Sequence, residues 1–109
     1  MTPKKLFLIT RRDLSPGQQA VQAAHAMREF KQEHPQVEQV WYETSNTLAL
    51  LEVEDEPALK NLLERARWKG VSASAFYEPD RGNELTAIAL GPDGKRLCQA
   101  LDLALQRVA

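Results

Sequence analysis

The sequence predicts one α/β domain over residues 1–109, a layer sandwich with the order β-α-β-α-β-β-α and a mixed four-stranded sheet. Three observations support this fold. Strand and helix patterns alternate in the first half of the chain, which implies parallel strands joined by right-handed crossovers. The last two predicted strands are joined by a short, turn-rich connection that permits an antiparallel hairpin. At 109 residues, the chain has room for one core but not for two.

The first predicted strand covers residues 4–10, and a helix follows it after a short polar turn. The helix is expected to begin at Ser15, with Pro16 at its first position and Gln18 completing a Ser-x-x-Gln capping box. His34–Pro35 is expected to end it, because the residue before a proline disfavours helical geometry.

The continuous apolar run at residues 47–53 is typical of a central strand. A helical pattern over residues 54–69 follows, with Asp55 as a cap and Gly70 as its stop. The remaining elements are predicted as strands near 71–77 and 85–90 and a last amphipathic helix that carries Leu97, Leu101, Ala104, Leu105 and Val108.

The composition is that of an ordinary soluble protein, with 43% hydrophobic and 27% charged residues. Cys98 is the single cysteine, which excludes an intrachain disulfide and a cysteine-based zinc site. It falls in an apolar pattern, so we expect a buried, inert thiol. The apolar run near the start is too short for a signal peptide or a membrane span, so a cytoplasmic protein with no membrane partner is expected.

A protein that holds RNA mainly through phosphates should have a basic surface, but the net charge here is −1. Two local basic clusters have two interpretations, a solvated surface or a local RNA contact: Lys4, Lys5, Arg11 and Arg12, and Arg65, Arg67 and Lys69. Trp41 and Trp68 likewise either stack on bases or pack in a core or interface, and packing is the expected role.

The polar side chains that follow the first strand are the main candidates for a site. Strand-to-helix junctions are where α/β sheets usually place their ligands. Gln18, Gln22, His25 and Glu29 share one helical stripe, which is either a solvated face or the wall of a pocket. His25 and Glu29 lack a third ligand, so no metal site is expected.

Three segments together resemble the type-2 peptidyl-tRNA hydrolase family. They are Arg-Asp-Leu…Gly…Gln-Ala-Ala-His-Ala at 12–26, Phe-Tyr-Glu at 76–78 and Thr-Ala-Ile-Ala-Leu-Gly-Pro at 86–92. The resemblance covers nearly the whole chain. It implies a cytoplasmic homodimer without a cofactor that hydrolyses the ester between a peptide and the 3′ end of tRNA.

The chain departs from the family pattern at two places. Gln18 stands where the family has a lysine implicated in catalysis, and the acid of the following loop is Glu78 instead of aspartate. The family's loop threonine has no counterpart, although Thr86 matches a threonine or serine near the next strand. The chain therefore resembles a divergent, hydrolase-like branch.

These considerations give two sets of candidate residues. A general base is expected at Glu78 or Asp80, with His25 as the third catalytic candidate. The expected substrate-binding residues are Asp13, Gly17, Gln18, Gln22, Asn83 and Thr86, with the helix N-terminus at Gly17 and Gln18 seating an oxyanion or phosphate. Helix capping for Gln18 and ordinary turn polarity for the loop residues are the competing explanations.

Three functions remain open from the sequence. The first is hydrolysis of peptidyl-tRNA or another acylated tRNA. The second is a non-catalytic dimeric binding module that kept the fold and lost the lysine. The third, an RNA-binding domain without chemistry, is disfavoured by the net charge of −1.

Overall fold

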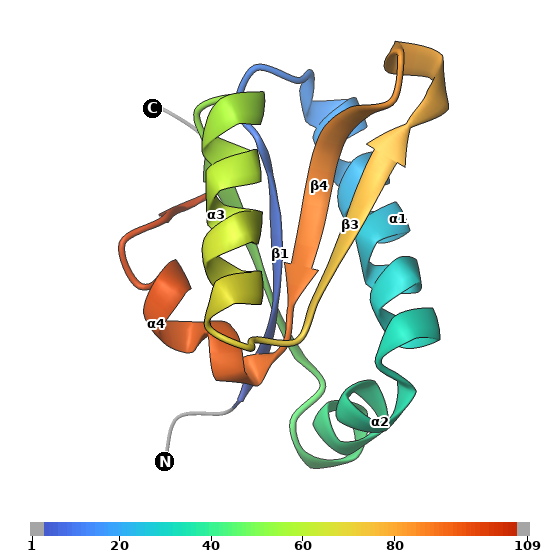
Figure 1. Cartoon of the computed structure of the whole chain (residues 1–109), viewed down its shortest axis with the longest axis vertical. Helices are drawn as coiled ribbons and strands as arrows, with labels where there is room; N and C mark the ends of the chain where they lie inside the picture. The colour runs from blue at the N-terminus through green and yellow to red at the C-terminus, as the bar shows by residue number, and fades with distance from the viewer. Residues whose placement is uncertain (1–3, 107–109) are drawn as a thin grey trace.

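A computed structural model describes residues 4–106, which form a central sheet with helices on both faces (Figure 1). The elements in chain order are β1 (Lys5–Arg11), α1 (Pro16–Glu33), α2 (Pro35–Thr44), β2 (Thr47–Val53), α3 (Glu56–Trp68), β3 (Ala73–Glu78), η1 (Pro79–Arg81), β4 (Glu84–Leu90), η2 (Pro92–Gly94), α4 (Lys95–Cys98) and β5 (Asp102–Leu103). The strand order is β3-β4-β1-β2-β5. Only β1 and β2 run parallel, so the predicted mixed sheet is confirmed.

The two faces of the sheet bury separate apolar clusters. Figure 1 shows α1 on one face, α3 and α4 on the other, and α2 across one end. On the α1 side, Ala23, Ala26 and Phe30 are buried against the sheet, and the two alanines let the helix lie close to it. On the α3 side, Leu59 and Leu62 pack with alternate residues of β1, β2 and β4.

The predicted helix boundaries are confirmed at three positions. The Ser15 hydroxyl accepts a hydrogen bond from the Gln18 N–H at 3.3 Å, which caps α1. The Asp55 carboxylate accepts one from the Ala58 N–H at 3.0 Å, which caps α3. Gly70 follows α3 with a φ of +73°, a left-handed conformation that glycine adopts without strain.

The structure contains a helix that the sequence pattern does not predict. Pro35 ends α1 but is also the first residue of α2, where its fixed φ suits the first helical turn. Trp41 on this helix is 5% exposed and packs in the α1-side cluster. Its indole N–H donates to the Thr47 carbonyl at 2.8 Å, so the expectation that Trp41 packs is confirmed.

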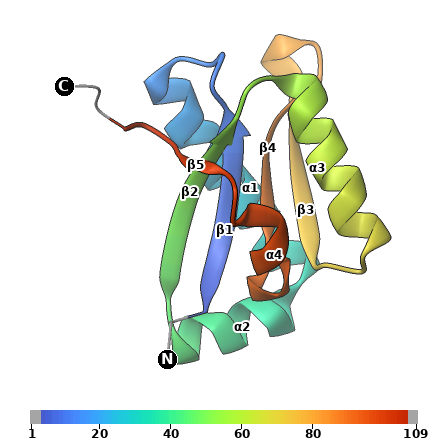
Figure 2. The same ribbon diagram turned by 90° about the vertical axis from the view of Figure 1, so that its left-hand side faces the viewer.

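The predicted four-stranded sheet and long final helix are both wrong. The sheet has five strands, and the last helix is only Lys95–Cys98. The chain then pairs antiparallel with β2 as β5 (Figure 2). Beyond this strand, the Ala104 N–H donates to the Leu50 carbonyl at 2.9 Å. Hydrogen bonds to the open edge of β2 replace helical ones, and Leu105 has a φ of +59°. Val108 lies outside the described residues.

The polar turn after β1 and the polar β3–β4 connection lie at the same end of the sheet. β1 and β2 end there, β3 ends there and β4 begins there. The polar turn after β1 leads directly into the first turn of α1 at the same end. This edge therefore places the start of α1 beside the β3–β4 connection.

Candidate functional site

A β-bulge lies in the β3–β4 pair at the site end of the sheet. Phe76 lies opposite Ala87, but the next residue, Tyr77, lies opposite Leu85. Thr86 is therefore the extra residue of β4, with no partner in the ladder. Such bulges re-aim side chains and occur often beside active sites.

The bulge decides which face Thr86 uses. In a regular strand, Thr86 and Ile88 face the same side, because side chains alternate. Ile88 packs in the cluster beneath α3. Thr86 instead points to α1, where its hydroxyl meets Gln22 at 2.7 Å. The extra residue thus delivers a hydroxyl group to the α1 face.

Gln22 is held at both ends of its side-chain amide. Its Oε1 accepts from the Thr86 hydroxyl at 2.7 Å, and its Nε2 donates to Oε1 of Glu78 at 3.2 Å. The opposite amide orientation would face a carbonyl oxygen toward the Glu78 carboxylate, so the network decides the orientation. Gln22 is 3% exposed, and burial of an amide requires such partners.

Glu78 combines one fixed oxygen with one open oxygen. It is the last residue of β3 and is half-buried. Its Oε1 takes the Gln22 hydrogen bond, whereas Oε2 accepts none from residues 4–106. The carboxylate is therefore oriented by α1 while one of its oxygens remains free for a water or a substrate.

His25 lies one turn after Gln22 on the same stripe of α1. Its ring stacks on Phe76 of β3, with centroids 4.2 Å apart and planes 7° from parallel. The imidazole is otherwise exposed, so its nitrogens stay accessible at the ring edge. Stacking thus fixes the plane of the ring while leaving it free to bind.

Arg11 is a buried cation at the end of β1 that pairs with two partly exposed carboxylates. It is 5% exposed and donates to both Asp13 oxygens, at 2.8 and 3.0 Å, and to Glu84 at 2.8 Å. It also donates to the Leu85 carbonyl at 3.1 Å. The hydrogen bonds from Arg11 lower the pKa of Asp13 and of Glu84, and the one to Asp13 contributes most to raising the pKa of Arg11.

The ion cluster changes the interpretation of two predicted residues. Asp13 is occupied by Arg11 and ties the turn before α1 to β4, so its contacts are structural. Arg12 pairs with Glu52 and, at 3.4 Å, with Asp102. Arg11 is not a solvated or RNA-contacting charge, because it is buried and bound to carboxylates, whereas Arg12 stays exposed, as the solvated-surface interpretation expects.

The β3–β4 connection is a single 3₁₀ turn followed by two left-handed residues. Gly82 and Asn83 both have a φ of +62°, and asparagine tolerates this conformation better than most residues. The Asn83 N–H donates to the Glu78 carbonyl at 2.9 Å, which closes the loop. Asp80 is exposed, and within residues 4–106 its carboxylate makes no hydrogen bond.

The first turn of α1 presents an open surface. Gln18 is exposed, and its side chain makes no hydrogen bond to any described residue, so only the Ser15 half of the predicted capping box forms. Nothing lies within 4 Å of the position of a Cβ on Gly17. Gln19, not Gln18, is the buried glutamine here, donating to the Leu14 carbonyl at 2.8 Å.

The structure thus brings four of the predicted residues together, three by direct hydrogen bonds and His25 through its stacking on Phe76. Gln22 contacts Glu78 and Thr86, and Phe76 lies beside them with His25 stacked on it. The pairing of Arg11 with Glu84 is not predicted from the sequence. The one sequence feature that points to this pair is its position, since Arg11 is the last residue of the apolar strand β1 and Glu84 is the first residue of the apolar strand β4.

Two further expectations have clear outcomes. Cys98 is 5% exposed, and burial raises its pKa to about 12, as expected of an inert thiol. Trp68 is 90% exposed at the end of α3, so core packing is wrong for this tryptophan. It lies beside the exposed Arg65, Arg67 and Lys69, at the far end of the sheet from Glu78.

Comparison with known proteins identifies the family. The family model described as "Peptidyl-tRNA hydrolase PTH2" matches residues 4–106. The chain belongs to the peptidyl-tRNA hydrolase PTH2 family. Membership supports a hydrolase-like function in translation with peptidyl-tRNA as its substrate, as the resemblance implies. A search among curated proteins gave no match.

A solved structure also resembles this member of the peptidyl-tRNA hydrolase PTH2 family. It is a protein of unknown function from Agrobacterium tumefaciens strain C58, with a TM-score of 0.66 over 94% of this chain and 98% of that one. At 15% identity, the likeness shows the fold alone. Among residues 4–106, no helix is long and apolar enough to span a membrane, and no group of three or more side chains is placed to hold a metal.

Proposed function

We propose that the protein hydrolyses the ester between a peptide and the 3′ end of tRNA, as a single cytoplasmic domain that assembles as a homodimer. The observation that carries the proposal is the Thr86–Gln22–Glu78 network, in which two hydrogen bonds of 2.7 and 3.2 Å orient one carboxylate. A bulge, a buried amide and an oriented acid are a costly combination for a surface with no chemistry to perform.

Glu78 is the general base in this proposal. Its free oxygen accepts a proton from a water, and the water oxygen attacks the ester carbonyl carbon. The bond to the ribose 3′ oxygen then breaks, and that oxygen takes the proton held by Glu78, which restores the carboxylate. The hydrogen bond from Gln22 holds the carboxylate in place, so no side chain has to reorganise as charge develops.

The other predicted residues surround this base with supporting roles. The open first turn of α1, at Gly17 and Gln18, presents the positive end of the helix dipole to an oxyanion or a phosphate. The imidazole of His25, held flat on Phe76, hydrogen-bonds the substrate from its edge. Asp80 and Asn83 act from the loop only if the substrate reaches it.

A specific observation also favours the second candidate, a non-catalytic dimeric binding module. Gln18, where the family has a lysine, is an uncharged side chain without a partner among the described residues. The nearby Arg11 does not replace the missing cation, because it is buried and bound to Asp13 and Glu84. On this alternative, the same surface binds an acylated tRNA end without cleaving it.

A hydrolysis assay on the purified full chain separates the two candidates. We expect the wild-type protein to release peptide from peptidyl-tRNA and Glu78→Gln to lose this activity. Asp80→Asn is the matched control, because it removes an equivalent charge two residues further along the chain. Binding of peptidyl-tRNA with no release by the wild type would establish the binding module instead.

A further inference from the structure

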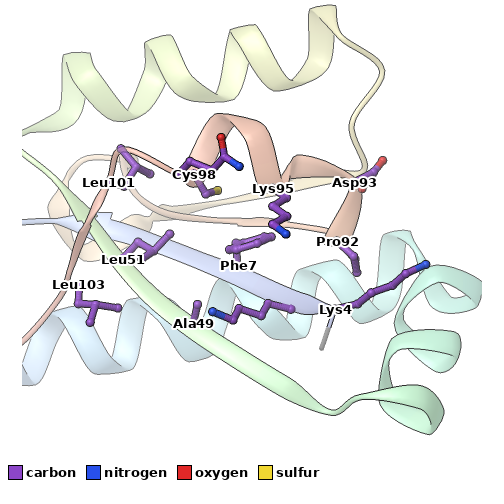
Figure 3. A pocket seen from close by; sticks show the side chains of 12 residues that line it. Lys4, Phe7, Ala49, Leu51, Pro92, Asp93, Lys95, Cys98, Leu101 and Leu103 are labelled. Carbon is purple, nitrogen blue, oxygen red and sulfur yellow. The ribbon is translucent and has the colours of Figure 1, made fainter. Parts of the chain in front are cut away.

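A hollow lies on the opposite face of the sheet from Glu78, at the start of β1. Its volume is about 600 Å³, within the range of small-molecule sites of roughly 300–1,000 Å³. Phe7, Ala49 and Leu51 form its floor, and Leu101 and Leu103 face it from the crossing C-terminal segment (Figure 3). The floor of the groove is therefore apolar.

The groove exists because the final helix is short. An amphipathic helix continuing through Leu101 and Leu105 would cover the β1–β2 face with its apolar stripe. α4 instead ends at Cys98, and the chain turns away to pair with β2 at its edge. Phe7 and Leu51 are members of the α3-side cluster, 7% and 6% exposed, and they also line a hollow beside this single helical turn.

The rim of the groove carries an excess of positive charge. Lys4, Lys5 and Lys95 line it, and Figure 3 shows the Lys95 side chain extending toward Phe7. Asp93 is the one carboxylate of the lining, and it already accepts a hydrogen bond from the Ser72 N–H at 3.1 Å. An apolar floor with a cationic rim is complementary to a molecule that has an apolar chain and one anionic end.

We propose that this groove binds a medium-chain fatty carboxylate, with its chain over Phe7 and Leu51 and its carboxylate among the lysines. A neutral amphiphile would gain no attraction from the three lysines of the lining, and a cationic one would be repelled by them. The site is separate from the proposed hydrolysis site, since the two lie at opposite ends of β1 and on opposite faces of the sheet.

Calorimetry with sodium decanoate on the full chain tests the proposal. We expect one decanoate per chain with a Kd of about 0.1 mM. Decanol should bind about tenfold more weakly, and decyltrimethylammonium should not bind. Amide resonances of Phe7 and Leu51 should shift on titration, whereas those of Gln22 and Glu78 should not.

Two variants and a matched control locate the ligand. Lys95→Glu should weaken decanoate binding about tenfold, whereas Lys31→Glu, the same charge change on exposed α1, should not alter it. Ala49→Phe should fill the groove and abolish binding. Its thermal unfolding and its peptidyl-tRNA hydrolysis should match the wild type, which excludes misfolding as the cause.

Three outcomes would overturn the proposal. Equal affinity for decanol and decanoate would mean that the lysines select no anion. Tighter binding of decyl phosphate than of decanoate would mean that the carboxylate is the wrong head group. Absence of decanoate binding would mean that the groove takes no fatty carboxylate, and conversion of a dimer to monomers by Leu103→Asp would then show that a second copy of the chain covers it.

Discussion

The hydroxyl of Thr86 donates to the side-chain carbonyl of Gln22 at 2.7 Å, across the interface between β4 and α1. This contact exists because Thr86 is the extra residue of a bulge, and a regular strand would turn the hydroxyl to the other face. Thr10 supports the same position by donating its hydroxyl to the Thr86 carbonyl at 3.0 Å. The bulge therefore determines the orientation of Glu78, because it aims Thr86 at Gln22 and Gln22 in turn donates to Glu78.

Thr86→Val should reduce both stability and hydrolysis. Valine keeps the shape of threonine but leaves the buried Oε1 of Gln22 without a donor, which costs about 1–3 kcal/mol of unfolding free energy. Urea denaturation and the peptidyl-tRNA assay measure the two effects. Thr86→Ser restores the hydroxyl and should recover both. A fully active Thr86→Val protein would show that the Gln22 orientation does not matter.

Gln18→Lys should raise the hydrolysis rate about tenfold or more, because it places a cation at the open first turn of α1, where negative charge develops. A positive charge at a helix N-terminus is unfavourable, so stability should fall slightly, by about 0.5 kcal/mol. Initial rates and thermal unfolding check both effects. Gln18→Met, a neutral control of similar length, should leave the rate unchanged, and an equal gain from methionine would contradict the argument.

Acid should unfold the protein partly through Asp13 and Glu84. Both groups have a folded-state pKa below the ordinary value, so the stability they contribute is present above about pH 4 and is lost as the pH falls through their folded-state pKa values. Urea midpoints between pH 7 and pH 2 measure the slope. The double variant Asp13→Asn, Glu84→Gln should flatten it, whereas exposed Glu64→Gln should not. If the urea midpoint of the double variant falls with pH as steeply as that of the wild type, the pairing of Asp13 and Glu84 with Arg11 does not contribute to the acid sensitivity.

The thiol of Cys98 should resist modification in the folded protein. Burial raises its pKa to about 12, so the thiolate is scarce at pH 8, and only 5% of the residue is exposed. A thiol-disulfide indicator should react within minutes in guanidinium but slowly in buffer, at a rate that follows opening of the fold. Rapid reaction of the native protein at pH 8 would mean that α4 opens independently.

Local sequence patterns predicted most of the fold. Ser15, Asp55 and Gly70 end or begin helices because caps act over a few residues, so their chemistry is visible in the chain. The prediction of a long final helix was wrong because the helical pattern of this segment competes with pairing to a distant strand, β2. The open edge of β2 offers hydrogen bonds to Asp102–Leu103, and no periodicity in that segment reports them.

The sequence predicts which residues form the site but not how the fold orients them. The resemblance singled out Gln22, Glu78 and Thr86, and the structure brings these residues into direct contact. The bulge that aims Thr86 depends on the register between two strands, and no residue type in the sequence marks it. The burial of Arg11 likewise depends on its partner Glu84, 73 residues away in the chain.

The most direct test of the account compares hydrolysis of peptidyl-tRNA by the wild type, Glu78→Gln and Asp80→Asn at matched folded concentration. We expect turnover by the wild type, a loss of about 100-fold or more in Glu78→Gln and near-normal turnover in Asp80→Asn. Undiminished turnover by Glu78→Gln would contradict it, because the Thr86–Gln22–Glu78 network would then not hold the catalytic base.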